Sequence, residues 1–192
     1  FVARDITDLK TATEEVARAL EAVSNGDYTQ KVDLSGLEGD LAEIGENVNK
    51  TIGSIERFID QLEDAKKRNE QIIESIADGL CVTDVEGNWL ITNPAMAKIT
   101  GYSQEELLGR KTEDQPFWQL PEAQEATKEM WERVNAGETA TGVEMPWVRK
   151  DGKRIIISSS EQSLKDTKGN VIGEVFVARD ITDLKTATEE VA

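Results

Sequence analysis

Histidine is absent from the 192 residues, and cysteine occurs once, at Cys81. The missing histidine excludes a histidine-ligated haem, a histidine-bearing zinc site, a Ser-His-Asp triad and a phospho-accepting histidine within this sequence. One thiol can form neither an internal disulfide nor a C-x-x-C metal site, which favours a reducing compartment. No apolar run approaches the ~18 residues of a membrane span. Because the chain starts at Phe1 without signal-peptide character, we expect a cytoplasmic segment of a longer protein, whose parent is either membrane-anchored or not.

Basic residues are scarce beside acidic ones. Lysine and arginine number 22 against 38 aspartates and glutamates, which gives a formal net charge of −16. Nucleic acid and anionic lipid would be repelled by this charge, so we expect no nucleic-acid partner. The acidic residues are spread along the chain, which indicates a solvated surface rather than an acidic tail.

One sequence of 17 residues occurs twice. FVARDITDLKTATEEVA stands at residues 1–17 and again at 176–192, an offset of 175 residues. Chance does not produce this identity. A tandem array with that period explains the identity, and each unit of such an array could relay a signal to the next. The alternative is an artificial duplication.

Two stretches carry apolar residues at the alternating three- and four-residue spacing of a helical seam. The first runs from Ile6 to Val23, has Asp5 as its expected N-cap and ends at Gly26. The second begins at Leu41 and continues through Ile76. The apolar positions that we expect to face a neighbouring helix are Val16, Leu20, Val23, Leu41, Ile44, Val48, Ile52 and Ile55.

The connector over residues 27–39 is long enough to run back along a whole helix, whereas antiparallel neighbours need only ~2–8 residues. We therefore expect a parallel helix pair. One pair cannot bury its narrow seams alone, so two chains are predicted to form a homodimer with a parallel four-helix bundle. The alternative is an antiparallel hairpin that folds back on the other domain.

The second helix opens with a distinctive pattern of Gly39, Asp40, Leu41, Ile44, Val48 and Asn49, and the turn at 25–27 ends the first helix. This arrangement resembles a HAMP domain, closest to the divergent type of chemoreceptors. The resemblance implies a HAMP domain over residues 11–62 and a connecting helix over 63–76. The first helix lacks the proline that often opens membrane-proximal HAMP domains, which fits an internal copy.

After Ile76 the spacing becomes that of strands, predicted at 79–84, 89–93, 140–149, 154–164 and 171–179 with glycine-containing turns. Asn93-Pro94 predicts a helix start with Asn93 as N-cap, and a longer helix is expected over 123–134. The order is two strands, short helices, a longer helix and three strands.

Residues 93–109 read NPAMAKITGYSQEELLG, a turn follows at 149–152, and the last strand exits through Arg179-Asp180-Ile181-Thr182. Together these motifs resemble a PAS domain over 71–183. The resemblance implies an α+β fold in which a long helix joins the helical pair to a five-stranded antiparallel sheet. Residues 1–10 then correspond to the tail of a preceding PAS domain and the start of a linker helix, and 184–192 to the start of the next HAMP helix.

PAS domains use the space between the sheet and the short helices for haem, flavin, small acids or nothing. Strand alternation places Val143, Met145 and Trp147 on one face of their strand. The simpler interpretation of each apolar residue here is a core position, because a filled core needs the same residue types. The residues that we expect around the space are Ile91, Ile99, Leu108, Trp118, Trp131, Val143, Met145, Trp147 and Ile157.

The sequence identifies no cofactor. A cysteinyl-flavin adduct is disfavoured because no reactive-cysteine helix of the blue-light type is present, and Cys81 on the first strand is more simply a small buried side chain. Histidine-ligated haem is disfavoured by the lack of histidine. A small-molecule ligand and an empty pocket both stay open.

The resemblance implies a signal relay at Asp180, Ile181 and Thr182, with Asp5, Ile6 and Thr7 as their repeats. We predict a non-catalytic sensory and relay segment of a chemoreceptor-like transducer, working with neighbouring PAS and HAMP units and a downstream signalling domain. The alternatives are a dimerising spacer with an empty pocket, and the input segment of a sensor kinase or cyclase. No nucleophile–base pair, phosphate loop or metal cluster in the sequence supports an enzyme.

Overall fold

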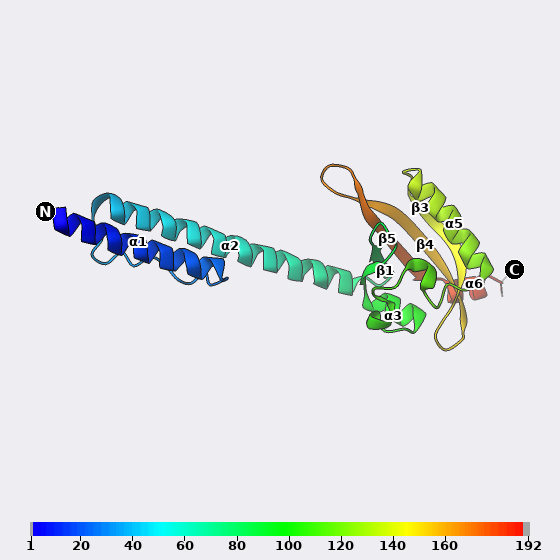
Figure 1. The fold of residues 1–192 in the computed structure, drawn as a ribbon. Coiled ribbons are helices and arrows are strands. Elements are labelled where there is room, and N and C mark those ends of the chain that lie inside the picture. The colour runs from blue at the N-terminus through cyan, green and yellow to red at the C-terminus, as the bar shows by residue number, and fades with distance from the viewer. Residues whose placement is uncertain (1, 190–192) are drawn as a thin grey trace. The chain divides into compact units, whose positions relative to one another are not determined.

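The computed structural model describes residues 2–189, and side chains over 6–188. The chain divides into two compact units, Phe1–Asn69 and Glu70–Ala192. The first is helical and the second contains a sheet (Figure 1).

The helical unit consists of α1 (Val2–Ser24) and the first part of α2 (Gly39–Ser75). Both helices run in the same direction and the connector returns along them (Figure 1), consistent with the parallel pair expected from its length. The Asn49 side chain fastens the connector, because it accepts from the Val32 amide at 2.7 Å and donates to the Val32 carbonyl at 3.0 Å. A small core forms behind this contact from Ala12, Ala19, Val32, Leu37 and Ile52.

The start of α1 differs from the prediction. Asp5 was expected to cap a helix beginning at Ile6, but the helix already includes Val2–Asp5. The identical residues Val177–Asp180 form the end of a strand. Val2–Asp5 pair with none of the described strands, and their backbone hydrogen bonds are made within the helix instead.

The sheet of the second unit has the order β2-β1-β5-β4-β3 and is antiparallel throughout, which confirms the predicted five strands. Each predicted strand lies within one residue of the observed bounds. The strands are β1 (Gly79–Thr83), β2 (Trp89–Thr92), β3 (Ala140–Val148), β4 (Arg154–Lys165) and β5 (Val171–Asp180).

The helices between the strands are α3 (Pro94–Thr100), α4 (Gln104–Leu107), the 3-10 turn η1 (Thr112–Asp114) and α5 (Pro121–Asn135), and α6 (Thr182–Glu189) follows the sheet. The predicted cap of α3 is confirmed, since the Asn93 side chain accepts from the Met96 amide at 3.0 Å. The same oxygen accepts from the Leu80 amide, and the Asn93 amide group donates to the carbonyls of Ile73, Ile76 and Asp78. One fully buried side chain therefore fixes the end of α2, β1 and α3 together.

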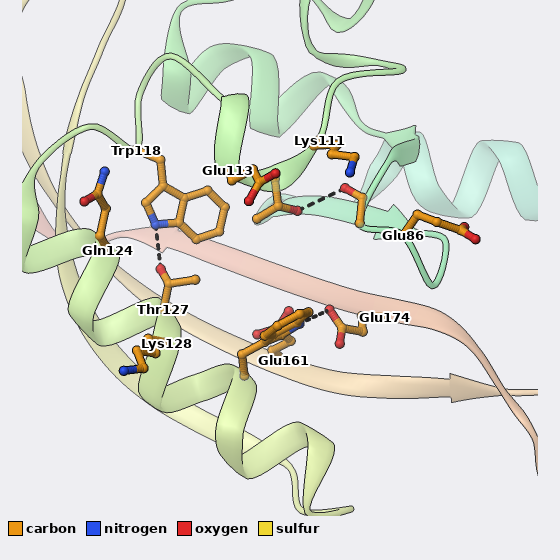
Figure 2. Close-up of a pocket in the computed structure, with 12 residues that line it drawn as sticks. Glu86, Lys111, Glu113, Trp118, Gln124, Thr127, Lys128, Glu161 and Glu174 are labelled. Carbon is orange, nitrogen blue, oxygen red and sulfur yellow. Dashed lines mark hydrogen bonds between the residues drawn. The ribbon is translucent and has the colours of Figure 1, made fainter.

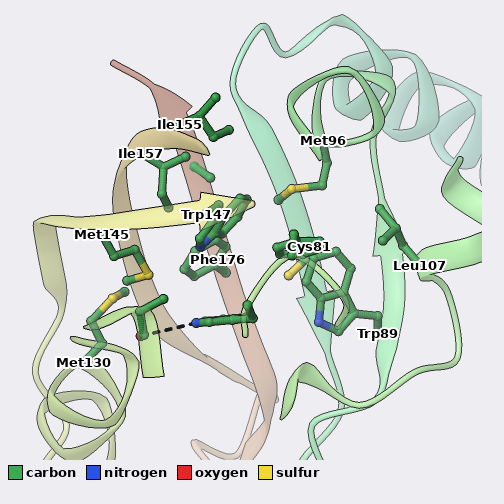
Figure 3. Packing of buried hydrophobic residues seen from close by; sticks show 14 of the residues in the cluster. Cys81, Trp89, Met96, Leu107, Met130, Met145, Trp147, Ile155, Ile157 and Phe176 are labelled. Carbon is green, nitrogen blue, oxygen red and sulfur yellow. Dashed lines mark hydrogen bonds between the residues drawn. The ribbon is translucent and has the colours of Figure 1, made fainter. Parts of the chain in front are cut away.

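An aromatic core fills the space between the sheet and its helices (Figure 3). The Trp147 ring stacks on Phe176 with centroids 6.0 Å apart, and Phe117 lies 4.5 Å from Trp147. Burial alternates on β4, where Ile155, Ile157 and Ser159 are buried, whereas β3 buries Met145, Pro146 and Trp147 in succession. This core occupies the middle of the inner face of the sheet.

Candidate functional site

Beside the aromatic core lies an open cavity of about 450 Å³ between α5, η1, the β1–β2 turn and the inner face of the sheet (Figure 2). This volume falls within the ~300–1,000 Å³ range of small-molecule pockets. The lining residues are Glu86, Gly87, Lys111, Thr112, Glu113, Trp118, Gln124, Thr127, Lys128, Trp131, Glu161 and Glu174.

Two glutamates on neighbouring strands form the floor of the cavity. Glu161 on β4 pairs with Phe176 in the register, and Glu174 on β5 pairs with Ser163 and with Thr83. Because side chains alternate along a strand, both carboxyls project from the same inner face. Glu161 is only 9% exposed, and Glu174 is half-buried beside it.

The neighbourhood of Glu161 changes the acidity of its carboxyl. Burial raises the pKa of Glu161 to about 8, and the neighbouring carboxyl of Glu174 contributes to the rise through its charge and a hydrogen bond. Like charges at short distance disfavour double ionisation, so the pair holds a proton at neutral pH. No lysine or arginine of the described residues forms an ion pair with Glu161 to offset this cost.

Two tryptophans from different segments border the same cavity. The Trp131 indole on α5 donates to the Glu174 carboxyl at 3.2 Å, and its side chain is 52% exposed at the mouth. The Trp118 indole is buried and donates to the Thr127 hydroxyl of α5 (Figure 2). The cavity therefore combines aromatic walls with an acidic floor.

Of the nine residues predicted around the pocket, Trp118 and Trp131 line this cavity. Met145, Trp147 and Ile157 are fully buried in the core, and Ile99 and Val143 pack against that core, as the simpler interpretation had it.

Ile91 and Leu108 are exposed, by 39% and 38%, and do not face inward. The pairing of β1 with β2 is irregular between Val82 and Thr83, so Trp89 and Thr92 turn inward in place of Ile91. On α4 the buried residue is Leu107, one position earlier than predicted.

Cys81 lies on β1 among the core residues. Burial raises the pKa of its thiol well above the ordinary value, with smaller contributions from Glu161 and Glu174. A thiol held protonated in this way is a poor nucleophile. The small-hydrophobe role predicted for Cys81 fits this position.

The exit from the sheet is built by backbone and side-chain hydrogen bonds. The Asp180 carboxylate accepts from the Thr182 amide at 2.9 Å and from the Thr182 hydroxyl at 2.6 Å. The Thr182 hydroxyl in turn accepts from the Ile156 amide at 2.9 Å, and the Ile181 amide donates to the Ile156 carbonyl at 2.9 Å. The start of α6 is thus attached to β4 as well as to β5. Of the repeated residues, Ile6 and Thr7 lie within α1, and the side chain of Asp5 falls outside the described ones.

Within residues 2–189, no group of three or more histidine, cysteine, aspartate or glutamate side chains could hold a metal ion. None of the helices described here is both long and apolar enough to cross a bilayer.

The PAS fold family matches residues 67–181. Curated relatives include the methanogenesis regulatory histidine kinase FilI of Methanothrix harundinacea, 27% identical over 79% of this chain and 17% of its own length. The signal transduction histidine-protein kinase AtoS of Escherichia coli is 26% identical over 83% of this chain and 24% of its own length. The chain thus spans less than a quarter of each of these relatives.

Solved structures show the same fold. The PAS domain of a protein from Colwellia psychrerythraea has a TM-score of 0.55 at 24% identity, over 62% of this chain and 98% of that one. The PAS domain of an HTR-like protein from Haloarcula marismortui has a TM-score of 0.54 at 21% identity, over 66% and 99%.

The chain belongs to the PAS family, since the match covers more than half of its residues. It contains a PAS sensory domain whose relatives are sensor histidine kinases, and the PAS region itself is a non-catalytic module.

Proposed function

We propose that the PAS unit senses a small ligand in the cavity on its inner face and passes the change through Asp180-Ile181-Thr182 to the helix that follows. The observation that carries this proposal is that the same two strands form the cavity floor and the exit. Glu161 and Ile156 lie five residues apart on β4, and Glu174 and Asp180 lie six residues apart on β5. At ~3.3 Å per residue, each strand spans ~17–20 Å between the two places.

A strand bonded on both sides transmits displacement well. β4 lies between β3 and β5, and β5 lies between β1 and β4, so neither is an edge strand. A shift at the Glu161–Glu174 floor therefore moves the strand ends that hold Thr182 rather than being absorbed at a free edge. An ion pair from Lys185 of α6 to Glu144 of β3, at 2.6 Å, adds a third strand to the attachment.

The proposal extends to a homodimer built through the helical unit, which we interpret as a HAMP-type pair. Its support is an apolar groove along α1 and α2 that nothing in the described chain fills, lined mainly by Leu20, Val23, Ile44, Val48, Ile52 and Ile55. Leu20 and Ile44 are 51% and 52% exposed, at seam positions of helices that run in parallel. A second copy offers the matching seam for a parallel four-helix bundle.

The output of the parent protein is also a proposal. The pattern at 39–52 favours a chemoreceptor-like transducer in the cytoplasm, with neighbouring PAS and HAMP units. The relatives FilI and AtoS favour the input segment of a sensor kinase. The relay through Thr182 is the same under either output.

Amide hydrogen exchange on the 192-residue chain tests the relay. Asp180→Ala removes the acceptor for Thr182, at a local cost of roughly 0.5–2 kcal/mol, which is small beside a domain stability of ~5–15 kcal/mol. Exchange over residues 181–188 should accelerate while the core of the sheet keeps its protection.

The matched control is Asp166→Ala. Asp166 makes the same kind of turn contacts, accepting from the Lys168 and Asn170 amides, but in the β4–β5 hairpin. It should leave residues 181–188 unchanged. The relay is wrong if Asp180→Ala leaves α6 protected, or if it exposes the whole sheet at once.

Sensing is distinguished from the spacer alternative by screening small molecules against the melting temperature of the chain. A sensor is expected to be stabilised by its ligand, and that ligand should also change exchange over 181–188. A ligand that stabilises the sheet without any effect at α6 would contradict the sensory role.

A further inference from the structure

The chemistry of the cavity is more specific than a general ligand site. Its lining contains four glutamates and two lysines, so acidic side chains outnumber basic ones even with one proton held by the Glu161–Glu174 pair. The lysines do not offset the floor, since Lys128 points away from Glu161 and Glu174, and Lys111 lies across the cavity near Glu113 (Figure 2). An anionic ligand would meet repulsion at the floor.

Glu161 lacks a compensating group. The residue is 9% exposed and lines the cavity, and among the described residues the charged group beside its carboxyl is another carboxyl, that of Glu174. Burying a carboxylate without a cation or several donors is costly. Burial and the neighbouring Glu174 raise the pKa of Glu161, so its carboxyl keeps a proton at neutral pH, and a cation bound beside it would favour the ionised form.

A second unpartnered group lies in the same row of the sheet. The Thr83 hydroxyl is buried, has no hydrogen-bond partner within the described residues, and belongs to the residue paired with Glu174 on β1. Glu161, Glu174 and Thr83 carry side-chain oxygens on one face of the sheet, and among the described residues only the Trp131 indole donates to either carboxyl from outside the pair. The two carboxyls of the floor therefore offer more acceptor oxygens than the surrounding side chains have donors for.

From this geometry we infer that the cavity takes a small organic cation bearing N–H donors, an ammonium, amidinium or guanidinium compound, with its charge on Glu161 and Glu174 and its body between Trp118 and Trp131. Charge-assisted N–H bonds to carboxylates are short and strong, and planar cations also bind to the faces of tryptophan rings. The inference rests on the proposed function, because it names the ligand class for the same cavity.

Three compounds of one shape test the charge. Benzamidine is a planar cation, benzamide is its neutral counterpart and benzoate is the anion. Calorimetric titration of the 192-residue chain should give binding for benzamidine, affinity weaker by about tenfold or more for benzamide, and no heat for benzoate. Benzylamine, an ammonium probe, should bind as a cation does.

The matched variants are Glu161→Gln and Glu125→Gln. Both remove one carboxylate, but Glu125 is exposed on α5 and does not line the cavity. Glu161→Gln should weaken benzamidine by about tenfold or more and leave benzamide unchanged, whereas Glu125→Gln should alter neither. Glu174→Gln is the second variant, with circular dichroism to confirm that each protein is folded.

The inference is overturned if benzamide binds as well as benzamidine, if benzamidine does not bind, or if calcium or magnesium chloride alone raises the melting temperature and Glu161→Gln abolishes that rise. Failure of the proposed function is a different result. Benzamidine would then bind in a Glu161-dependent way without changing hydrogen exchange over residues 181–188.

Discussion

The helical unit and the PAS unit depart from ordinary burial in opposite ways. In the helical unit, leucine and isoleucine seam residues such as Leu20 and Ile44 are half exposed. In the PAS unit, an acidic residue, Glu161, is only 9% exposed. Covering apolar surface lowers the free energy of the chain. Pairing a buried charge with an opposite charge offsets the cost of removing it from water. We propose that each exception marks a missing partner, and the proposed partners differ in kind: an apolar helix surface for one unit and a positive charge for the other.

The largest expected effect separates the stabilities of the two units. Trp147→Ala removes a fully buried ring that stacks on Phe176 and contacts Phe117, which should cost ~3–5 kcal/mol. Urea unfolding followed by near-ultraviolet circular dichroism measures the loss in the sheet unit. The helical unit should be unaffected, so that the dimer proposed for it persists in the variant. The independence of the two units is wrong if this dimer is lost together with the sheet.

The next effect concerns the buried carboxyl and pH. In the folded chain Glu161 keeps its proton up to about 8, whereas in the unfolded chain it releases it near the ordinary value of 4.5. The unfolded state thus binds fewer protons between these values, and stability should fall as pH rises through them, by at most about 1.4 kcal/mol per pH unit.

Urea midpoints across this pH window, for the native chain and for Glu161→Gln, measure the effect. The variant should show a flatter profile, and equal slopes would contradict the assignment. The other titratable groups that face Glu161 or share its cavity are Glu174 on β5, Cys81 on β1, Lys128 on α5, and Glu86, Lys111 and Glu113 across the cavity.

A third prediction addresses the exposed seam. Single cysteines at Leu20 or Val48, in a Cys81→Ser background, should form disulfide crosslinks between like positions of two chains, because a parallel bundle brings equivalent residues together. Lys50→Cys is the control, since Lys50 lies on the exposed side of α2 and pairs with Glu46.

Ile44→Asp should weaken the dimer by about tenfold or more, as an unpaired charge enters the seam. A monomer by light scattering at ~100 μM, well above a typical micromolar dissociation constant, would refute the dimer.

The smallest effect is expected where α6 meets β3. Lys185→Gln removes the ion pair with Glu144, whose side chains are 44% and 47% exposed, and should cost at most ~1 kcal/mol. Hydrogen exchange over 181–188 should rise slightly in low salt and not at all in high salt. If Lys185→Gln lost as much exchange protection over 181–188 as Asp180→Ala, the main attachment of α6 would be through Lys185 and not through Asp180.

The sequence predicted the sheet well because its signals are local. Asn93-Pro94 marks the start of α3 by capping chemistry, and the glycine turns fix where the strands end. The start of α1 could not be predicted in the same way, since the residues Val-Ala-Arg-Asp form a helix at 2–5 and a strand at 177–180. Only the presence of β1 and β4 beside the second copy decides between the two.

The acidic floor was missed although β4 carried a signal. Alternation puts Ile155, Ile157 and Ser159, all buried, on one face of β4, and two residues further the same rule puts Glu161 on that face as well. What the sequence could not supply was the register of β5, which brings Glu174 beside it. Nor could it show that Gly173 lets β5 approach β1 so closely that a methyl group there would lie 1.9 Å from the Thr83 carbonyl oxygen.

All four tryptophans, at 89, 118, 131 and 147, belong to the PAS unit, and they divide by environment. Trp89, Trp118 and Trp147 are buried, while Trp131 is half exposed at the mouth of the cavity with its indole on Glu174. Buried indoles emit at shorter wavelengths than solvated ones. The long-wavelength edge of the intrinsic fluorescence is therefore dominated by Trp131. It contains no contribution from the helical unit, because that unit has no tryptophan. A ligand that fills the cavity as proposed would cover Trp131 and shift this emission, so that binding could be read without an attached dye.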